Sequence, residues 1–278
     1  MRIRLGPAVA GTIIAAAAAL GIGNQRWSRA TADAVERLTR ASGTGPRRRY
    51  SRQEIEGLPA PVVRYFDFAL TPGQPIVRRA TFEQRGDFAM KRGEWRRMRA
   101  TQTSWISPPG FVWDASIAMV PGVNVRVRDG YFGGSAAMKG AVGGLVPVVD
   151  QADTPGLPEG ALLRYLAEAP LIPPALLPSA GVVWTPIDDS TARATLADAG
   201  VTVAMDARFA ASGEIVRVSA ERYRDVDGTG VPTPFEGVWS DYLRVDGMMI
   251  PTAGEAMWLL PEGPHSFWRA RITNARFD

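Results

Sequence analysis

An arginine and a glutamate four residues apart are the side chains of this sequence best spaced to act together. Arg164 and Glu168 lie in the segment RYLAEA, and on an α-helix this spacing puts both on one face. A buried pair of this kind can serve as an acid, a base or a clamp for a polar headgroup, and the adjoining Tyr165 is assigned to the same candidate site. Most such pairs are solvent-exposed and contribute only about 0.3–0.5 kcal/mol to the stability of a helix. An ordinary surface ion pair is therefore the alternative interpretation.

A second carboxylate, Asp114, lies inside the aromatic segment FVWDA. If its side chain points into an apolar interior, it needs a charged partner, and an arginine is the expected one. If it lies on the polar side of a strand, it faces water instead. In the first case Asp114 and Glu168 could be the acid and base of a hydrolase or isomerase, with Arg164 stabilising developing negative charge.

Large aromatic residues are a third group with a potential binding role. The 278 residues include 8 tryptophans, and seven of these lie beyond residue 90. Tryptophans along a curved sheet can line an apolar ligand cavity, and we assign Trp113, Trp184 and Trp258 to such a cavity. The alternative is that they belong to an ordinary hydrophobic core.

The sequence holds few residues for nucleophilic or metal chemistry. It has no cysteine and a single histidine, His265, which follows Pro264 in an expected turn. A thiol nucleophile, a Cys-ligated zinc ion and a multi-histidine site are therefore excluded within one chain. The motifs G-x-S-x-G, G-x-x-x-x-G-K-[ST] and H-E-x-x-H are also absent. We therefore expect no cofactor and no metal, and we favour a role without catalysis.

A mainly β fold would position these residues. From about residue 75, apolar and polar residues alternate in ten runs that are mostly joined by short turns, which favours an antiparallel meander. The runs cover residues 76–88, 95–106, 111–119, 123–128, 182–197, 201–209, 215–223, 238–245, 248–259 and 267–277. Asp129-Gly130 is an expected hairpin turn. The glycine-rich residues 130–144 are either a mobile flap or a bulged strand against which another element packs.

Helices interrupt the strand pattern at few places. Within residues 159–177, Leu162, Leu163 and Leu166 favour an amphipathic helix that ends near Pro170. A second helix is expected after Pro61 and a third over residues 31–42. The whole pattern predicts an α+β fold in which a strongly curved antiparallel sheet, or half-open barrel, of about ten strands wraps around one or two helices. A barrel capped by a helix is the alternative.

The N-terminus contains an uncharged run of 19 residues, Leu5 to Gly23, behind Arg2 and Arg4. A helix of this length spans roughly 28 Å, about the thickness of the hydrocarbon core of a bilayer. We interpret it as a single-pass membrane anchor, and a cleaved secretory signal is the competing interpretation. The expected organisation is residues 1–24 as anchor or signal, 25–50 as helix and basic linker, and 51–278 as one curved-sheet domain.

The charge of the chain divides unevenly. Residues 1–50 carry nine arginines and two acidic residues, a net charge of +7, whereas residues 51–278 carry 23 basic and 26 acidic residues, a net charge of −3. The domain therefore lacks the basic surface that nucleic acid requires, and we expect no nucleic-acid partner. Counting arginines places the domain in the cytoplasm, but a first hydrophobic segment often initiates export. We favour the extracytoplasmic side of a bacterial cell membrane.

Several short motifs together carry a resemblance to a known family. They are LPAPVVRYF (58–66), PPGFVWDA (108–115), LLRYLAEAPLIPPALLP (162–178), VVWTPIDDSTARATLADAGVTV (182–203), DGMMIPTAGEAMWLLPEG (246–263) and FWRARI (267–272). In these stretches, over about residues 55–277, the chain resembles a bacterial family known only as a domain of unknown function. Pro170 departs from the pattern, which has a bulky residue there. The expected fold is also similar to the curved sheet of bacterial lipoprotein carriers, a similarity that does not transfer function.

The sequence therefore predicts a membrane-anchored binding module that holds an apolar ligand, such as a lipid or acyl chain, in the concavity of its sheet. Trp113, Trp184 and Trp258 would line the cavity beside Asp114, and Arg164, Tyr165 and Glu168 would lie at its polar end. The alternatives are the hydrolase or isomerase described above and an envelope interaction protein with no cavity.

Overall fold

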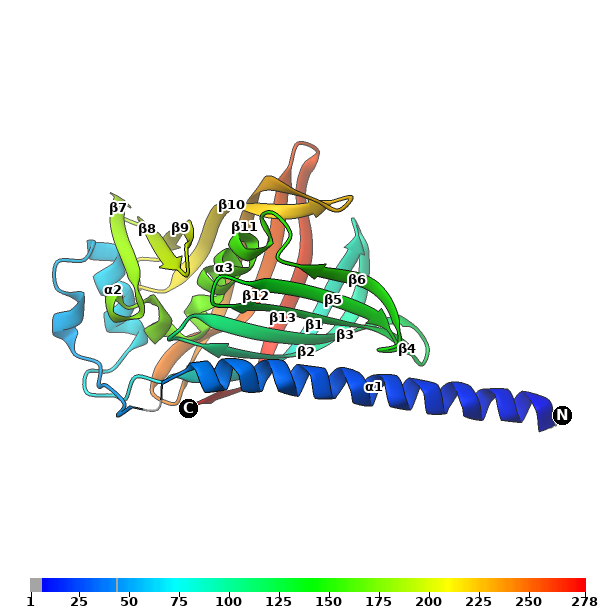
Figure 1. Ribbon diagram of the computed structural model, residues 1–278. Helices are drawn as coiled ribbons and strands as arrows, with labels where there is room; N and C mark the ends of the chain where they lie inside the picture. The colour runs from blue at the N-terminus through cyan, green and yellow to red at the C-terminus, as the bar shows by residue number, and fades with distance from the viewer. Residues whose placement is uncertain (1–6, 44) are drawn as a thin grey trace.

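One curved antiparallel sheet makes up most of the protein (Figure 1). The computed structural model describes residues 7–43 and 45–278, with side chains from residue 18 onward. Thirteen strands pair in the order β6-β5-β4-β3-β2-β1-β13-β12-β11-β10-β9-β8-β7. The first six strands are β1 (Arg79–Lys91), β2 (Glu94–Trp105), β3 (Gly110–Val120), β4 (Val123–Phe132), β5 (Ala136–Val142) and β6 (Val146–Ala152). The others are β7 (Val182–Asp188), β8 (Thr191–Asp198), β9 (Val201–Phe209), β10 (Ile215–Val226), β11 (Thr229–Val245), β12 (Met248–Leu260) and β13 (Gly263–Phe277).

Two meanders form the sheet and meet where β1 pairs with β13. The register of the ladder shifts in β1 at Glu83/Gln84 and in β12 at Ala256/Met257. Such irregularities bend a strand and increase its twist, which accounts for the strong curvature of the sheet. Gly86 in β1 lies so close to the backbone of Arg269 that a Cβ atom there would overlap it. The predicted curved antiparallel sheet is thus confirmed.

The number of strands is larger than the ten predicted. Residues 182–197 form two strands, because Asp188 accepts hydrogen bonds from Ser190 and turns the chain there. The glycine-rich residues 130–144 form the end of β4 and the whole of β5, which pairs with β6. The predicted turn at Asp129-Gly130 is wrong, since both residues continue the ladder between β4 and β5.

The concave face of the sheet encloses α3 (Leu157–Glu168), which contacts β9 and β10 on one side and β3, β4 and β5 on the other. Pro170 and the following prolines end the helix as expected, and short 3₁₀ turns follow at Ala169–Leu171, Pro173–Leu176 and Pro178–Ala180. After the 3₁₀ turn Arg52–Ile55, α2 (Ala60–Ala69) covers one end of the sheet. The main hydrophobic core lies between these helices and the sheet.

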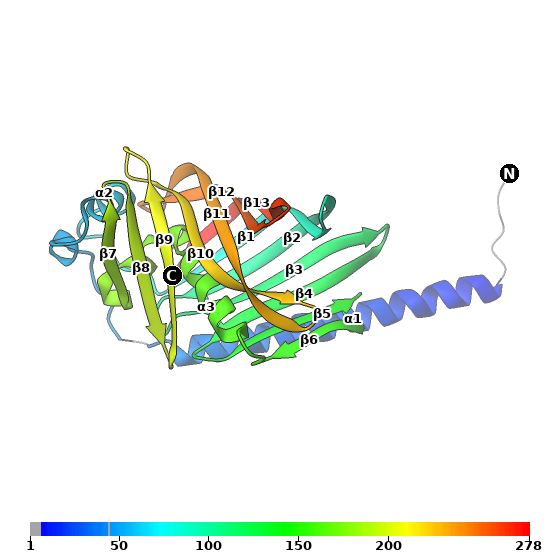
Figure 2. The same cartoon turned by 90° about the horizontal axis from the view of Figure 1, so that it is seen from above.

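A long helix, α1 (Pro7–Ala41), lies along the outer face of β2, β3 and β4 and extends past their ends (Figures 1 and 2). The helix predicted over residues 31–42 is its C-terminal part. The apolar run predicted over residues 5–23 lies largely outside the side chains that the structure describes. Among the residues that are described, no helix is long and apolar enough to cross a bilayer.

Asp114 holds α1 against the sheet. Its carboxylate accepts hydrogen bonds from Trp27 Nε1 (3.0 Å) and Thr31 Oγ1 (2.7 Å), and it forms an ion pair with Arg126 (2.9 Å). The side chain of Asp114 is only 11% exposed. Further along the helix, Leu38 packs with residues of β2 and β3. The carboxylate therefore acts as the polar anchor of a helix on the outer face.

Replacing Asp114 by alanine is expected to release the docked part of α1. The change removes two hydrogen bonds to a charged acceptor and leaves Arg126 without its partner, at a combined cost of about 2–4 kcal/mol. Limited digestion with trypsin should then cut several-fold faster after Arg26 and Arg29. Glu36→Gln is the matched control, since the exposed Glu36–Arg40 pair lies on the same helix and contributes little. Equal digestion rates in the two variants would refute this role.

Candidate binding pocket

A pocket of about 350 Å³ lies between the concave face of the sheet and α3. Its volume is within the range of small-molecule sites, roughly 300–1,000 Å³. The lining aromatic residues are Phe88, Trp113, Tyr223, Phe235, Trp239, Trp258, Phe267 and Trp268. A second hollow, of about 640 Å³, lies under α1 on the outer face and is lined largely by polar residues, Asp114 among them. The aromatic pocket is the better candidate for binding an organic ligand.

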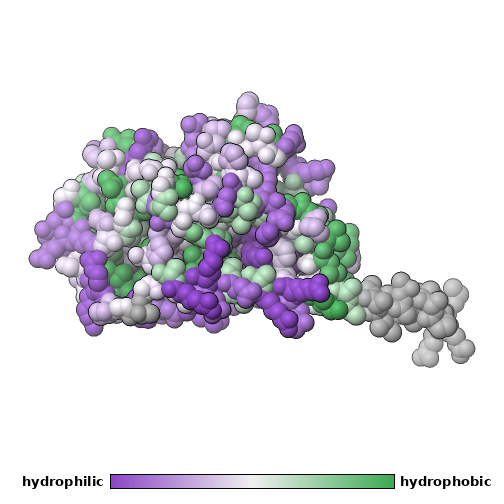
Figure 3. All heavy atoms as spheres, in the orientation of Figure 1, coloured by the Kyte–Doolittle hydropathy of each residue, from purple (hydrophilic) through white to green (hydrophobic). Residues whose placement is uncertain are grey.

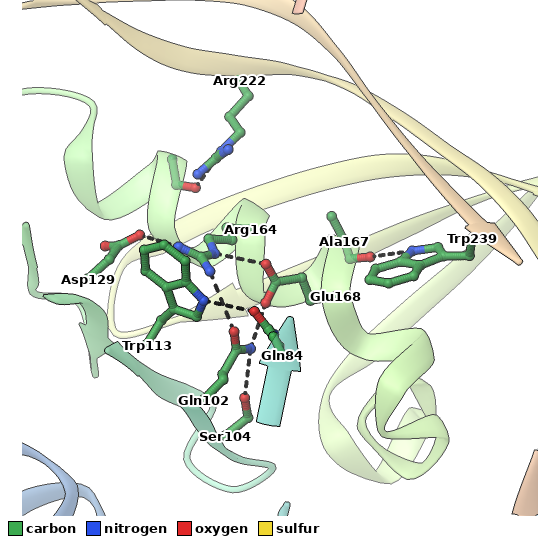
Figure 4. A network of polar contacts seen from close by, with 11 residues as sticks. Gln84, Gln102, Ser104, Trp113, Asp129, Arg164, Ala167, Glu168, Arg222 and Trp239 are labelled. Atoms are coloured by element: carbon green, nitrogen blue, oxygen red, sulfur yellow. Dashed lines mark hydrogen bonds and ion pairs between the residues drawn. The ribbon is translucent and has the colours of Figure 1, made fainter. Parts of the chain in front are cut away.

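Arg164 on α3 is the centre of a polar network at one end of the aromatic pocket (Figure 4). Its Nη1 donates to Asp129 on β4 at 2.6 Å, and its Nε donates to Glu168 at 2.8 Å. The guanidinium also lies over the rings of Phe111 and Trp113, with its Cζ 5.0 and 4.8 Å from their centroids. Burial opposes the charge of Arg164, but the two carboxylates outweigh it, so that the pKa of Arg164 is raised.

Two glutamines from neighbouring strands complete the network. Gln102 on β2 donates to the second oxygen of Glu168 at 2.6 Å and also to Ser104 at 3.2 Å. Gln84 on β1 accepts a hydrogen bond from Trp113 Nε1 at 2.9 Å. Both oxygens of Glu168 are therefore occupied by hydrogen bonds from the protein. The network fixes α3 and the tryptophan relative to three strands, as satisfied buried networks do.

Arg222 on β10 lines the pocket, is half-buried and forms no ion pair with a described carboxylate, and Arg224 two residues further along the strand shares these three features. The Nε of Arg222 donates to the Gly160 carbonyl of α3 at 3.0 Å, and this is its only hydrogen bond to a described residue. Its Cζ lies 5.3 Å from the ring centroid of Phe235 and 5.6 Å from that of Trp258. Burial, and to a smaller degree the nearby Arg164 cation, together lower the pKa of Arg222 to about 10.

The aromatic wall is itself tightly packed. Trp258 stacks on Phe267 with ring centroids 5.3 Å apart, and Phe235 meets Trp258 edge to face at 5.7 Å. Trp239 donates from Nε1 to the Ala167 carbonyl at 3.1 Å, which ties the wall to the end of α3. Packing of this kind holds the rings in place before any ligand arrives.

Comparisons with known proteins agree with the motifs of the sequence. A family model described as a family of unknown function (DUF6920) matches residues 56–277. The chain belongs to this family. The resemblance predicted over residues 55–277 is thereby confirmed, and all six motifs that carried it lie within or across the matched region.

The DUF6920 description assigns no activity, and no curated protein matches the chain. Among solved structures, the crystal structure of a LolA superfamily protein from Nitrosomonas europaea is similar at 12% sequence identity and a TM-score of 0.38. The alignment covers 82% of this chain and 94% of that one. The function of this DUF6920 protein must therefore be argued from its own pocket.

Four of the seven predicted site residues of this DUF6920 member line the pocket: Trp113, Arg164, Glu168 and Trp258. The other three lie elsewhere. Tyr165 is buried against the core, Trp184 is buried with its Nε1 donating to the Leu176 carbonyl, and Asp114 is on the outer face under α1. Asp114 and Glu168 are therefore on opposite faces of the sheet, and the structure does not bring the two carboxylates together as the acid and base of one site.

Several pocket residues were missed by sequence reasoning. Asp129 precedes Gly130 and the pair predicts a turn, while its ion pair with Arg164 leaves no local signal because the two residues are 35 positions apart. Arg222 lies in the strongly charged stretch ERYRD (221–225), which is typical of a solvent-exposed strand. His265, expected in a loop, lies on β13 and lines the pocket. Among the described side chains, no group of three or more His, Asp or Glu could hold a metal ion.

Proposed function

We propose that this protein is a binding module for an amphiphile, with the apolar chain of the ligand against the aromatic wall and an anionic headgroup at Arg222. The observation that carries the proposal is the combination of an aromatic pocket and a half-buried arginine that no carboxylate of the described pocket neutralises. A fatty acid or a lipid with an anionic headgroup supplies both complements. The ligand class is thus an acyl chain that ends in a carboxylate or phosphate.

The apolar end of the ligand is supported by the lining of the pocket. Rings of Phe235, Trp258 and Phe267 pack on one another and present a continuous apolar surface. Removing such a surface from water is favourable by about 25 cal/mol per Å² of apolar area. An acyl chain can cover this wall without a specific hydrogen bond, which suits a site that holds rather than transforms its ligand.

The polar end of the ligand is supported by the arginines of the pocket, of which Arg164 and Arg222 differ in their partners. Arg164 is held by Asp129 and Glu168 and has a structural role. Arg222 uses its Nε for Gly160 and keeps both Nη groups available. A charge in this position is costly unless it is paired, and a charge-assisted hydrogen bond from an anionic headgroup would pair it. Binding of an anionic headgroup would therefore stabilise the folded protein at Arg222.

The proposal includes an attachment to a membrane through residues 5–23, with the domain on the extracytoplasmic side of a bacterial cell membrane. The apolar sequence of this run supports the attachment, since its length matches the thickness of a bilayer core. A domain attached in this way would remain close to the lipids of the membrane, which are amphiphiles of the proposed class.

Filling the pocket is expected to abolish uptake of the ligand. Ala256 lines the pocket from β12, and Ala256→Trp places an indole ring in the space of the acyl chain. Titration with cis-parinaric acid, which accepts energy from tryptophan, should show saturable binding to the wild type and at least about tenfold weaker binding to the variant. Ala197→Trp on the exposed face of β8 is the matched control and should bind as the wild type does. Equal binding by all three proteins, or no binding by the wild type, would contradict the proposal.

A further inference from the structure

Five exposed apolar side chains gather at one end of the molecule and form a surface that we call the apolar rim. Ile22, Val120, Leu145, Val146 and Val148 are each between 40% and 60% exposed. They come from α1, from the end of β3, and from the hairpin of β5 and β6. Scattered apolar residues are common on protein surfaces, but a continuous group indicates an interaction site.

Close glycine contacts join the parts of the apolar rim. Gly23 lies against Leu145, and Gly143 lies against Leu20, so near that a Cβ atom on either glycine would overlap its neighbour. The Gly143 N–H donates to the Asn124 carbonyl at 2.8 Å, which links the hairpin turn to β4. Figure 3 shows the resulting hydrophobic surface at the end of the molecule where α1 leaves it. The rim is thus a built surface rather than a set of independent turns.

The chain itself indicates what covers the apolar rim. From Ile22 towards the N-terminus, the sequence of α1 continues into the apolar run of residues 5–23. A bilayer that receives this run also meets the side chains that surround the helix where it leaves the sheet. Arg26 and Arg29 follow within the next two turns of the helix, where they can reach anionic headgroups. A lipid surface is therefore the partner whose chemistry fits.

The ligand pocket opens towards the same end. Met90, at the end of β1, lines the pocket and is 43% exposed, and Tyr223 on β10 lines it and is 40% exposed. The turn after Met90 and the turn after Val120 both lie at the end of the sheet towards which β1 and β3 run (Figure 2). An amphiphile that leaves a bilayer beneath the apolar rim would meet the mouth of the pocket without crossing water.

We propose that the apolar rim rests in the boundary between the headgroups and acyl chains of a bilayer, and that the pocket takes its ligand directly from that membrane. The direction of transfer rests on the proposed ligand binding, whereas the contact with the bilayer rests only on the proposed membrane attachment through residues 5–23. The two parts are therefore tested by separate measurements on the same proteins.

Single cysteines can report the contact, because the chain has none of its own. The full chain with Val146→Cys, labelled with an environment-sensitive fluorophore, is reconstituted into vesicles of phosphatidylcholine and phosphatidylglycerol that contain a spin-labelled lipid. The label should be quenched at least about threefold more than the same label at Val183→Cys or Ile187→Cys, which are similarly exposed on the distant edge strand β7. Val120→Asp with Val148→Asp should reduce the quenching at position 146 to the level of these controls.

Transfer is measured with the same Val120→Asp, Val148→Asp protein without the label. Uptake of cis-parinaric acid from vesicles should become several-fold slower, while the affinity for the free acid in solution stays unchanged. Equal quenching at positions 146 and 183 would overturn the membrane contact, and so would label-dependent pairing of copies without lipid quenching, which indicates a second chain on the rim. Quenching at position 146 without any binding of the acid would instead overturn the proposed ligand binding and leave the membrane contact standing.

Discussion

Arg164→Ala is expected to lower the free energy of unfolding by about 3–5 kcal/mol, because it leaves two carboxylates without their cation in a largely apolar pocket. The side chain of Asp129 is 7% exposed and that of Glu168 is 19% exposed, so water can compensate little of the loss. For a chain of this size each kcal/mol shifts the midpoint of thermal unfolding by about 2–4 °C. Thermal unfolding followed by circular dichroism should therefore show a midpoint about 10 °C below that of the wild type.

Arg193→Ala is the matched control for this loss. Arg193 pairs with Asp206 on the outside of β8 and β9, where the two side chains are 53% and 30% exposed. A pair exposed to this degree contributes less than about 1 kcal/mol. Arg164→Lys keeps the positive charge but loses the planar guanidinium donors that reach two carboxylates. Its midpoint of thermal unfolding should lie between those of the wild type and Arg164→Ala. If the two alanine variants unfold at the same temperature, Arg164 is not the centre of the pocket network.

Arg222→Met is expected to have opposite effects on stability and on binding. Methionine removes a half-buried charge that lacks a partner, and it keeps most of the apolar contact with Phe235 and Trp258. Because water still screens part of the charge, the gain in the free energy of unfolding at neutral pH should be about 1–2 kcal/mol. The affinity for a fatty acid should fall about tenfold or more, as a charge-assisted hydrogen bond is lost. Binding of the corresponding fatty alcohol should change little.

The pH dependence of stability gives a second measurement for Arg222. Its pKa in the folded protein is about 10, which lies well below the ordinary pKa of an arginine in the unfolded chain. Between these two values the unfolded chain holds a proton on Arg222 that the folded chain has released, so this residue makes the wild type more stable as the pH rises. The stability advantage of Arg222→Met should therefore shrink above pH 10 in denaturant titrations. Arg217 forms an exposed ion pair with Glu236, so Arg217→Met should show neither the gain in stability nor the loss of affinity for the fatty acid.

Local patterns predicted those parts of the site that depend on neighbours in sequence. The spacing of Arg164 and Glu168 places them on one helical face, and the ion pair between them is present. Alternation along residues 111–115 also places Trp113 and Asp114 on opposite faces of a strand. The prediction that both line one site is therefore wrong for Asp114, because side chains of adjacent strand residues point to opposite faces of the sheet. The tryptophan lies in the pocket and the aspartate under α1.

Contacts between distant strands could not be predicted in this way. Asp129 precedes a glycine, and this pair of residues predicts a turn. Only the pairing of β4 with β5, which the local sequence does not reveal, shows that both residues continue the strand. Arg222 reads as a solvent-exposed residue, because nothing in its own strand indicates that the sheet curves around it. The curvature arises from register shifts such as the one in β12, which leave no clear mark in the sequence. The position of these residues in the pocket therefore depends on the curvature of the sheet as well as on their local sequence.

The most direct test of the binding function is mass spectrometry of the amphiphile that stays with the protein during purification. Wild-type protein, Ala256→Trp and Arg222→Met are released from the same membrane preparation and measured under native conditions. The wild type is expected to retain one anionic amphiphile per chain, Ala256→Trp none, and Arg222→Met a much smaller fraction. An empty wild-type protein that also fails to take up a fatty acid, or equal retention by all three proteins, would contradict the assignment of this pocket as the binding site.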